Sequence, residues 1–376
     1  MSRVRILLLT PGLGLGGSER LTLTYARGLN ARGHDTLIVH GPPEGLGATT
    51  RSAGVQHHLV YEERLGVRTL RPWLRALRAM VREFRPDVIH AQSVRTALVA
   101  AMVAPRTPLL ATVHGMEESQ ERGAAILLRL SRARVTAVSQ ASADGVQQYR
   151  LAPPMVIVPP AVDLDVLESS GRGVPATALL ERRPLVTCVA RHDPVKGVDV
   201  LIDAFPRVLE KVPEAGLQLV GGGSVHHEMV ARAEALGIGH AIDFTDFQSN
   251  PAPYLVGADL AVLPSRREGL PVSALEAFAL GRAVVATAVG GTPDVVRDGE
   301  TGWLVPPEQP EALAAAIVDA LTHPEERARR AALGHELVAR SYTVEVMIDR
   351  IEEICRSAAG SEPPVRRNSP GFRSAA

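Results

Sequence analysis

The chain has 376 residues, of which 45% are hydrophobic and 22% charged, and this length suits two globular domains. Acidic and basic residues balance at 41 each, so overall charge gives no indication of nucleic-acid binding, and we expect none. No stretch approaches the roughly 20 apolar residues that a membrane span needs. The opening MSRVRILLLTPG has an apolar run too short for a signal peptide, and Cys188 and Cys355 lie in different halves. These features predict a cytoplasmic protein without a disulfide framework.

Short apolar runs alternate with longer amphipathic segments along almost the whole chain. This alternation is typical of βα units, so the sequence predicts an α/β protein with two doubly wound parallel sheets. The strands expected in the first half are 5–10, 36–40, 87–91, 109–113, 134–138 and 155–158. Those expected in the second half are 185–190, 217–220, 241–245, 259–263, 283–287 and 302–305. The last helices are expected at 308–322, 324–340 and 343–358.

Composition divides the chain into successive parts. We expect a first domain over 1–165, a linker rich in Gly, Pro and Ser over 166–184, and a second domain over 185–342. A helix over 343–358 would cross back to the first domain, and the tail 359–376 has too little apolar surface to order itself. Ligands of doubly wound sheets bind beyond the carboxyl ends of the strands, so the loops at these ends are where chemistry is expected.

The loop after the first expected strand reads PGLGLGGSER. Gly12, Gly14 and Gly17 have the G-x-G-x-x-G spacing of dinucleotide-binding loops, although this match alone is weak. The acid that would hold a ribose is missing from the end of the second strand, since Asp35 stands before that strand, so NAD binding is rejected. Gly16 and Gly17 would still let amides at a helix N-terminus approach a phosphate. A plain tight turn is the alternative.

The sequence VARHDPVKG follows the first strand of the second half. Arg191 and Lys196 flank this turn, and a guanidinium with an ammonium can bind a diphosphate and neutralise charge on a leaving group. Lys196 and Lys211 are the only lysines of the chain, so Lys196 stands out in a composition that otherwise uses arginine. A solvated loop is the alternative. The glycines of 219–224 (LVGGGS) could also present amides, or could simply form a turn.

The stretch EGLPVSALEAFALG combines a loop with the start of a helix. Pro271 suits the first turn of a helix, so the residues before it lead into a helix N-terminus. Glu268 would project beside the amides of Gly269 and Leu270. Glu276 lies among apolar residues of the helix, where an unpaired carboxylate is costly, so both carboxylates suit the hydroxyls of a sugar or a ribose. The alternative is a helix-capping Glu268 and a Glu276 paired with an arginine.

Together, these motifs resemble the retaining, nucleotide-sugar-dependent glycosyltransferases of family GT4, whose GT-B fold has two Rossmann-like domains facing a central cleft. The resemblance covers about residues 4–355. The matching motifs are the Gly-Gly-x-Glu turn at 16–19, TVHG at 112–115, the Arg191/Lys196 pair, the spacing of Glu268 and Glu276, and GGTPDVVRDGETGWLVPP at 290–307.

The resemblance implies a reaction and its catalytic residues. Arg191 and Lys196 would stabilise the departing nucleoside diphosphate. Glu268 would hold hydroxyls of the transferred sugar, and His114 would lie beside the anomeric centre. Substitution would occur with retention and without a metal ion or other cofactor, because positive side chains and a helix dipole would replace a divalent cation. The sequence has no Asp-x-Asp motif or His/Cys cluster with metal spacing at a strand end, and the histidines at 226–227 would diverge on a helix.

The resemblance also implies how the donor is held. Glu276 would take the ribose hydroxyls, and the base would lie against the loops 221–224 and 245–249, largely through backbone contacts. The donor-binding residues implied in this way are Gly16, Gly17, Gly222, Phe247, Gly269, Leu270, Pro271 and Glu276.

The chain departs from the family pattern at three places. Pro160 and Ala161 stand where Asn-Gly is common, and Ala190 replaces a common glycine. His90 and Gln92 stand where two histidines are frequent, which leaves the acceptor-side role of His90 open. None of these departures removes a residue assigned to the donor.

The acceptor side, which the resemblance places in the first half, is less specific. One face of the amphipathic segment 68–87 carries Arg71, Arg75, Arg78 and Arg82. These arginines could attract anionic lipid headgroups, which would place the protein peripherally at the inner membrane face, or a phosphorylated acceptor. The alternative is a solvated arginine face on a helix that packs on the sheet.

We therefore expect a transferase (EC 2.4) that moves a hexosyl-type sugar from a nucleoside-diphosphate sugar to a hydroxyl of a small-molecule, glycan or lipid-linked acceptor. The alternatives are an epimerase or a non-catalytic nucleotide-sugar-binding protein of the same fold. A glycan phosphorylase would need a lysine for pyridoxal phosphate, and Lys211 at a helix end is poorly placed for it. The base, the sugar and the acceptor do not follow from these residues.

Overall fold

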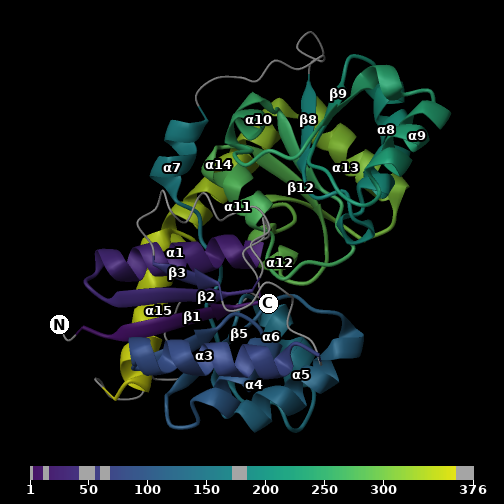
Figure 1. The fold of residues 1–376 in the computed structure, drawn as a ribbon. Coiled ribbons are helices and arrows are strands. Elements are labelled where there is room, and N and C mark those ends of the chain that lie inside the picture. The colour runs from purple at the N-terminus through teal and green to yellow at the C-terminus, as the bar shows by residue number, and fades with distance from the viewer. Residues whose placement is uncertain (1–2, 12–16, 42–55, 60–67, 172–183, 361–376) are drawn as a thin grey trace. The chain divides into compact units, whose positions relative to one another are not determined.

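The structure is a computed structural model, and it describes residues 3–11, 17–41, 56–59, 68–171 and 184–360. The chain divides into two compact units (Figure 1). Unit 1 takes Met1–Pro160 together with Val344–Ala376, and unit 2 takes Ala161–Thr343. Each unit is built on one parallel sheet with helices packed on it.

The sheet of unit 1 has seven strands in the order β3-β2-β1-β4-β5-β6-β7, and all its pairs are parallel. The strands are β1 (Arg5–Thr10), β2 (Asp35–His40), β3 (His57–Leu59), β4 (Val88–Ala91), β5 (Leu109–Val113), β6 (Arg134–Ala137) and β7 (Met155–Ile157). The central strand β1 is buried from Ile6 to Thr10. Because both faces of such a strand are covered, its sequence is a continuous apolar run without alternation.

The helices of unit 1 are α1 (Gly17–Ala31), α3 (Leu70–Phe84), α4 (Val94–Val103), α5 (Glu118–Ser131), α6 (Gln140–Gln147) and α15 (Val344–Ala358). Helices α3, α4 and α5 follow one another across one face of the sheet, where Trp73 and Leu77 join the core formed with Leu7 and Leu9 (Figure 1). Helices α1 and α15 pack against each other on the opposite face. They approach closely because Gly28 has no side chain: a Cβ there would lie 2.4 Å from Ile348.

Helix α15 joins unit 1 through a buried carboxylate, Glu352. Its oxygens accept hydrogen bonds from Arg32 Nη1 at 2.7 Å and Arg356 Nε at 2.8 Å, and Oε1 lies 3.1 Å from His34 Nε2. Burial by itself raises the pKa of Glu352, but these hydrogen bonds outweigh it and bring the pKa to about 2. The ionised carboxylate therefore fixes the last helix to residues at the end of α1 and the start of β2.

The sheet of unit 2 has six strands in the order β10-β9-β8-β11-β12-β13, and its pairs are also parallel. The strands are β8 (Leu185–Val189), β9 (Gly216–Val220), β10 (Ile242–Thr245), β11 (Leu260–Leu263), β12 (Ala283–Thr287) and β13 (Gly302–Val305). In order along the chain this is 3-2-1-4-5-6, the order of the dinucleotide-binding Rossmann fold.

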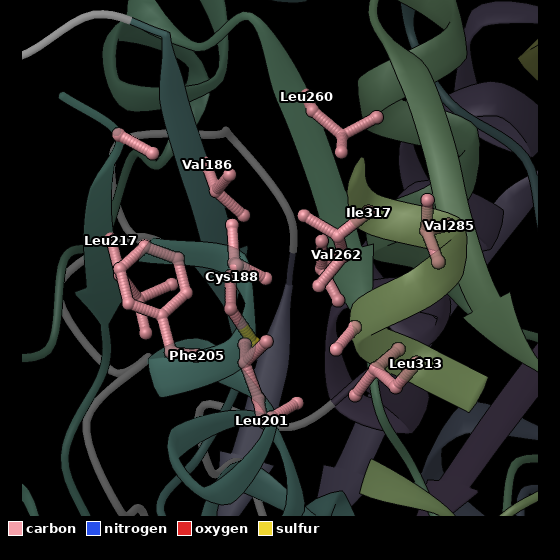
Figure 2. Packing of buried hydrophobic residues seen from close by; sticks show 14 of the residues in the cluster. Val186, Cys188, Leu201, Phe205, Leu217, Leu260, Val262, Val285, Leu313 and Ile317 are labelled. Carbon is pink, nitrogen blue, oxygen red and sulfur yellow. The ribbon is translucent and has the colours of Figure 1, made fainter. Parts of the chain in front are cut away.

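The helices of unit 2 are α7 (Leu164–Ser170), η1 (Pro194–Lys196), α8 (Val198–Lys211), α9 (His226–Ala235), η2 (Gly239–Ala241), α10 (Ala252–Gly257), α11 (Val272–Ala279), α12 (Thr292–Val295), α13 (Pro310–Thr322) and α14 (Pro324–Ser341). They form cores on both faces of the sheet, because successive residues of one strand join different clusters. Val262 and Val285 pack with α8 and α13, as Figure 2 shows, whereas Leu263 and Ala286 pack with α11.

The observed strands confirm the predicted α/β fold class, with ends that differ by at most one residue from those expected. The three-residue strand β3 is an addition that the sequence pattern did not predict, because so short a strand carries no detectable period. Helix α7 spans the end of the expected first domain and the start of the expected linker, and it packs on α10 and α11, so by its contacts it belongs to unit 2. The rest of the expected linker, 172–183, and the tail from 361 lie outside the described residues.

The Glu352 contacts predict a pH-dependent stability. A carboxyl with a lowered folded pKa stabilises the protein fully above its unfolded pKa of about 4.3 and loses this contribution as the pH falls towards the folded value. We expect Glu352→Gln to lower the melting temperature at pH 7, with a cost of about 2 kcal/mol, because buried cations lose their partner. The difference from wild type should shrink between pH 5 and pH 2.

The matched control is Glu353→Gln, since this neighbouring carboxylate is exposed. It should leave the melting temperature within about one degree of wild type, as a surface substitution does. A melting difference for Glu352→Gln that stays constant from pH 7 to pH 2 would contradict the assigned role of the ionised carboxylate.

Candidate functional site

The site of unit 2 lies where its strand order reverses. Strands β8 and β11 are neighbours in the sheet, but the chain continues from β8 towards one edge of the sheet and from β11 towards the other. Ligands of doubly wound sheets bind beyond the carboxyl ends of the strands at such a switch point. The loop after β8 carries Arg191 and Lys196, and the loop after β11 carries Glu268, so the sheet brings the predicted residues to one edge.

Lys196 and Glu268 form an ion pair at this edge. The Lys196 Nζ atom donates to Glu268 Oε1 at 2.6 Å, and the Ser265 hydroxyl donates to the same oxygen at 2.7 Å. The two charged side chains are only 24% and 11% exposed. The described residues donate no hydrogen bond to the second oxygen, Oε2, so the carboxylate keeps a free acceptor while its negative charge neutralises the ammonium.

Two glycines allow the loops around this pair to pack backbone against backbone: Gly197 joins the loops after β8 and β11, and Gly290 joins the loop after β12 to the loop after β11. Gly197 has φ +63°, and a Cβ there would lie 2.0 Å from the carbonyl oxygen of Pro264. Gly290 has φ +51°, and a Cβ there would lie 1.8 Å from the carbonyl oxygen of Glu268 itself. Side chains at either position would force the loops apart. Gly197 was not singled out from the sequence, and Gly290 entered only as part of a longer motif.

Arg266 is a further residue that the sequence did not single out. Its guanidinium donates to both oxygens of Asp199 at 2.8 Å and to the carbonyl oxygen of Pro194 at 2.6 Å, and its amide donates to the Val195 carbonyl. The hydrogen bond to Asp199 raises the pKa of Arg266, and the same bond lowers the pKa of Asp199. This fork fixes the turn that ends in Lys196 to the loop after β11.

Arg191 lies in a different setting from Lys196. Its side chain is 61% exposed and forms an ion pair at 2.6 Å with Asp193, two residues along the same turn. The structure therefore does not join Arg191 to the Lys196–Glu268 pair. An exposed guanidinium held by one surface ion pair is easily redirected, since such pairs contribute little free energy.

Glycines also set the loop beside Arg191. A Cβ at Gly221 would lie 1.9 Å from the Ala190 carbonyl oxygen, and one at Gly223 would lie 2.5 Å from that of His192. Between them Gly222 has its nearest neighbour in the backbone of Phe247, at 3.9 Å. The Phe247 side chain is 42% exposed, which is unusual for a ring of this size and leaves a flat apolar surface beside the loop.

A pair of histidines supports the same turn. His192 is buried, its ring stacks on that of His226 with centroids 5.0 Å apart, and the two Nδ1 atoms lie 2.9 Å apart. Burial lowers the pKa of His192 to about 4, so this ring is neutral near pH 7. His226 was weighed from the sequence only as a metal ligand beside His227, and its contact with His192 was not predicted.

The helix after Glu268 is α11, and the structure qualifies the predictions made for its start. Pro271 is the N-cap of α11 and lies just before the first helical residue. Leu270 is buried with the core of that face, so only its backbone could meet a ligand. The Gly269 carbonyl accepts from Gly291, and Glu276 lies partly exposed on α11 among buried neighbours.

The predicted residues of unit 1 lie at the carboxyl ends of its strands. Gly17 is the first residue of α1 and is exposed, with no atom within 4 Å of a Cβ built there, whereas Gly16 lies outside the described residues. His114 follows β5, and burial lowers its pKa to about 4. Its Nε2 atom is buried and has no hydrogen-bond partner among the described residues.

The arginine face of α3 is exposed as predicted. Trp73 and Leu77 are buried beneath the helix, while the exposed side carries Arg71, Arg75, Arg78 and Arg82. None of these four arginines forms an ion pair with another described residue. Within the part of the chain that the structure describes, every helix is too short or too polar to span a membrane.

Curated relatives match part of the chain. A "GDP-mannose-dependent alpha-(1-6)-phosphatidylinositol monomannoside mannosyltransferase" of Mycolicibacterium smegmatis is 37% identical over 162 residues, which are 40% of this chain and 41% of the relative. A "D-inositol 3-phosphate glycosyltransferase" of Segniliparus rotundus is 34% identical over 250 residues, or 62% and 54% of the two chains. The chain thus spans about half the length of the curated relatives it matches.

Solved structures match almost the whole chain. Anabaena HepE, solved in complex with UDP and glucose, superposes with a TM-score of 0.83 at 20% identity, over 94% of this chain and 100% of that one. WaaG, a glycosyltransferase involved in lipopolysaccharide biosynthesis, gives a TM-score of 0.73 at 18% identity, over 95% of this chain and 100% of that one. At these identities the likeness shows the fold.

Two family models match successive parts of the sequence. The model "Glycosyltransferase Family 4" matches residues 15–166, and "Glycosyl transferases group 1" matches residues 175–335. Between them they include every described strand except β1, and the loops that hold Lys196 and Glu268. The chain belongs to glycosyltransferase family 4 and has the GT-B fold of two Rossmann-like domains.

Proposed function

We propose that the protein is a retaining glycosyltransferase that moves a hexosyl-type sugar from a nucleoside-diphosphate sugar to an acceptor hydroxyl. The observation that carries this proposal is the Lys196–Glu268 pair at the switch point of unit 2, with Nζ and Oε1 2.6 Å apart. One group suits an anionic leaving group and the other suits sugar hydroxyls. Because the two side chains are held next to each other, they suit a ligand whose anionic leaving group and sugar hydroxyls are also next to each other.

The charges of the site suit diphosphate departure. Lys196 would lie against the diphosphate, and Arg191 would turn from Asp193 to add a second positive charge as the bond to the sugar breaks. Glu268 would accept hydroxyl hydrogen bonds at Oε2, the oxygen to which the described residues donate none, while Ser265 and Lys196 hold Oε1 in place. The pair is thus arranged before the donor arrives.

The proposed reaction balances within the donor and acceptor. The acceptor oxygen forms a bond to the anomeric carbon from the face that the diphosphate leaves, and the bond from that carbon to the phosphate oxygen breaks. The electron pair of the broken bond goes to the diphosphate, whose oxygen takes the acceptor proton. Cationic side chains would supply the charge stabilisation, so we propose that the reaction needs no divalent cation and no other cofactor.

We propose the remaining donor contacts for loops of unit 2 and for the start of α1. We place the base beside Gly222 and the exposed Phe247 ring, the ribose at Glu276, and the sugar next to the backbone of Gly269, Leu270 and Pro271. The amide of Gly17 at the start of α1 would meet a phosphate. The sugar-side role of His114 likewise remains part of this proposal.

The acceptor that we favour carries a cyclitol. Relatives that align with part of this chain are named for D-inositol 3-phosphate and for phosphatidyl-myo-inositol, and one is named for GDP-mannose. A solved structure of similar fold contains UDP, whereas a relative is named for GDP-mannose, so the base of the donor is to be determined by experiment. We therefore propose a soluble or lipid-linked inositol as the acceptor class.

Removal of either charge of the pair should abolish transfer. We expect Lys196→Met and Glu268→Gln each to lower turnover by about a thousandfold, or about 4 kcal/mol, because the leaving group or the sugar loses its preorganised partner. Turnover would be followed as nucleotide release from UDP-, GDP-, ADP- and dTDP-sugars, with melting temperature as the test of folding. Lys211→Met is the matched control, since Lys211 is exposed at the end of α8.

Two results would contradict this proposal. Turnover like that of wild type in Lys196→Met or Glu268→Gln would remove the assigned roles. Donor binding by the wild-type protein without any release of nucleotide, with or without inositol acceptors, would indicate a non-catalytic nucleotide-sugar-binding protein instead.

We also propose that the α3 arginines contact an anionic membrane surface. Each exposed arginine near such a surface contributes about 1 kcal/mol, so Arg75→Gln/Arg78→Gln should weaken sedimentation with phosphatidylglycerol vesicles by at least about tenfold at low salt. Arg329→Gln/Arg340→Gln removes equal charge from α14 of unit 2 and should have a smaller effect. Equal losses in both variants, or binding that is insensitive to salt, would contradict a contact through α3.

A further inference from the structure

Unpartnered polar atoms are concentrated in one part of unit 1. Six buried side-chain nitrogen or oxygen atoms of the described residues lack a hydrogen-bond partner, and five of them belong to Tyr25, His90, Gln92 and His114. The first three residues are at most 2% exposed. A buried polar group without a partner costs about 1–3 kcal/mol, so such a concentration calls for a ligand or ordered water.

The topology brings these four residues to one place. Alternate residues of a strand share a face, so His90 and Gln92 point to one side of β4, and Thr112 and His114 point to the same side of β5. Tyr25 reaches them from α1, with its ring 5.2 Å from that of His90. Strands β1 and β4 are neighbours where the sheet order of unit 1 reverses, the place where ligands of such sheets bind.

Nδ1 is the ring atom of His90 without a partner, and we assign its protonation from a chain of hydrogen bonds. The Thr136 hydroxyl donates to the Ala111 carbonyl at 3.5 Å, so its oxygen accepts from Thr112 at 2.9 Å. The Thr112 oxygen then accepts from His90 Nε2–H at 2.7 Å, since each hydroxyl has a single proton. This assignment leaves Nδ1 as a bare acceptor. Burial lowers the pKa of His90 to about 3, so the ring stays neutral.

The chemistry of these atoms selects hydroxyl groups. A bare imidazole nitrogen needs a donor and repels a phosphate or carboxylate oxygen, which has only lone pairs to offer. The Gln92 amide provides one acceptor and two donors, and the Tyr25 hydroxyl can donate or accept. A neutral polyol offers donors and acceptors on adjacent carbons and satisfies this set. His114 is partly exposed at the end of β5 and gives access from the surface.

We propose that Tyr25, His90, Gln92 and His114 form a binding pocket for the neutral polyol ring of the acceptor, with His90 Nδ1 accepting from one ring hydroxyl and Gln92 pairing with a second. Gln92 is then a specificity-determining residue, because its amide offers both a donor and an acceptor at one position. This inference rests on the proposed transferase function, since it names the part of the acceptor that unit 1 holds.

Gln92→Met tests the pocket by removing the amide while keeping the volume of the side chain. We expect transfer to an inositol acceptor to fall at least about tenfold more than acceptor-free nucleotide release, through a higher acceptor KM. The melting temperature should stay or rise, because an unpartnered buried amide is removed. Gln218→Met is the matched control: this buried glutamine of β9 is hydrogen-bonded to Asp243, so its loss should lower the melting temperature and leave the acceptor KM unchanged.

A second measurement observes the pocket directly. In protein labelled with ¹⁵N-histidine, His90 Nδ1 should give the shift of an unprotonated ring nitrogen, and that shift should move on titration with myo-inositol, methyl mannoside or N-acetylglucosamine. Binding of at least one of these neutral probes that is lost in Gln92→Met supports the proposal. Shifts that none of the three moves, while acceptor-free nucleotide release proceeds, would overturn the pocket and leave the transferase intact. Absence of nucleotide release both with and without an acceptor would instead contradict the proposed function.

Discussion

The ion pair between Lys196 and Glu268 depends on backbone contacts that only glycine permits. Gly197 lets the loop of Lys196 meet the loop of Glu268, some seventy residues later, because a carbonyl oxygen lies where a Cβ would be, and Gly290 in the same way lets the loop after β12 support the backbone of Glu268. The pair is mostly removed from water, so either charge alone would be costly to keep there. A ligand with an anion on one side and hydroxyls on the other can take over both halves of the interaction. The site is therefore stable when empty and still specific for a ligand of that composition.

The two units use the same topological position in different ways. Both sheets reverse their order at a central pair of strands, and both place polar residues in the loops there. In unit 2 the charged groups satisfy one another through Lys196, Glu268 and Arg266, and none of the unpartnered buried atoms among the described residues belongs to this unit. In unit 1 the groups are neutral and lack partners. An anion is attracted from a distance by charge, whereas a neutral hydroxyl is recognised only on contact.

The sequence predicts the parts of this arrangement that are local. Apolar runs identify twelve of the thirteen strands in the described part of the chain, and rarity in composition identifies Lys196. The missed supporting residues Arg266 and Gly197 act across long separations, Arg266 on Asp199 and Gly197 on a loop after another strand. No period or spacing reveals such contacts, because they arise only when parallel strands place their carboxyl ends side by side. The hydrophobic pattern therefore predicts the fold, but it does not predict the residues that hold the site loops in place.

Gln92 illustrates the same limit from the other side. In the sequence, Gln92 replaces the second of two frequent histidines, and no neighbouring residue indicates whether this replacement removes a function. In the structure it follows β4 on the same face as His90, whose free ring nitrogen we assign as an acceptor from its hydrogen-bonded chain of two threonines. A second neutral ring there could donate or accept through one nitrogen, whereas an amide does both at once. Each buried polar group without a partner costs about 1–3 kcal/mol. Two ligand hydroxyls that hydrogen-bond to these groups remove this cost, so unit 1 gains affinity for a neutral acceptor without using charge.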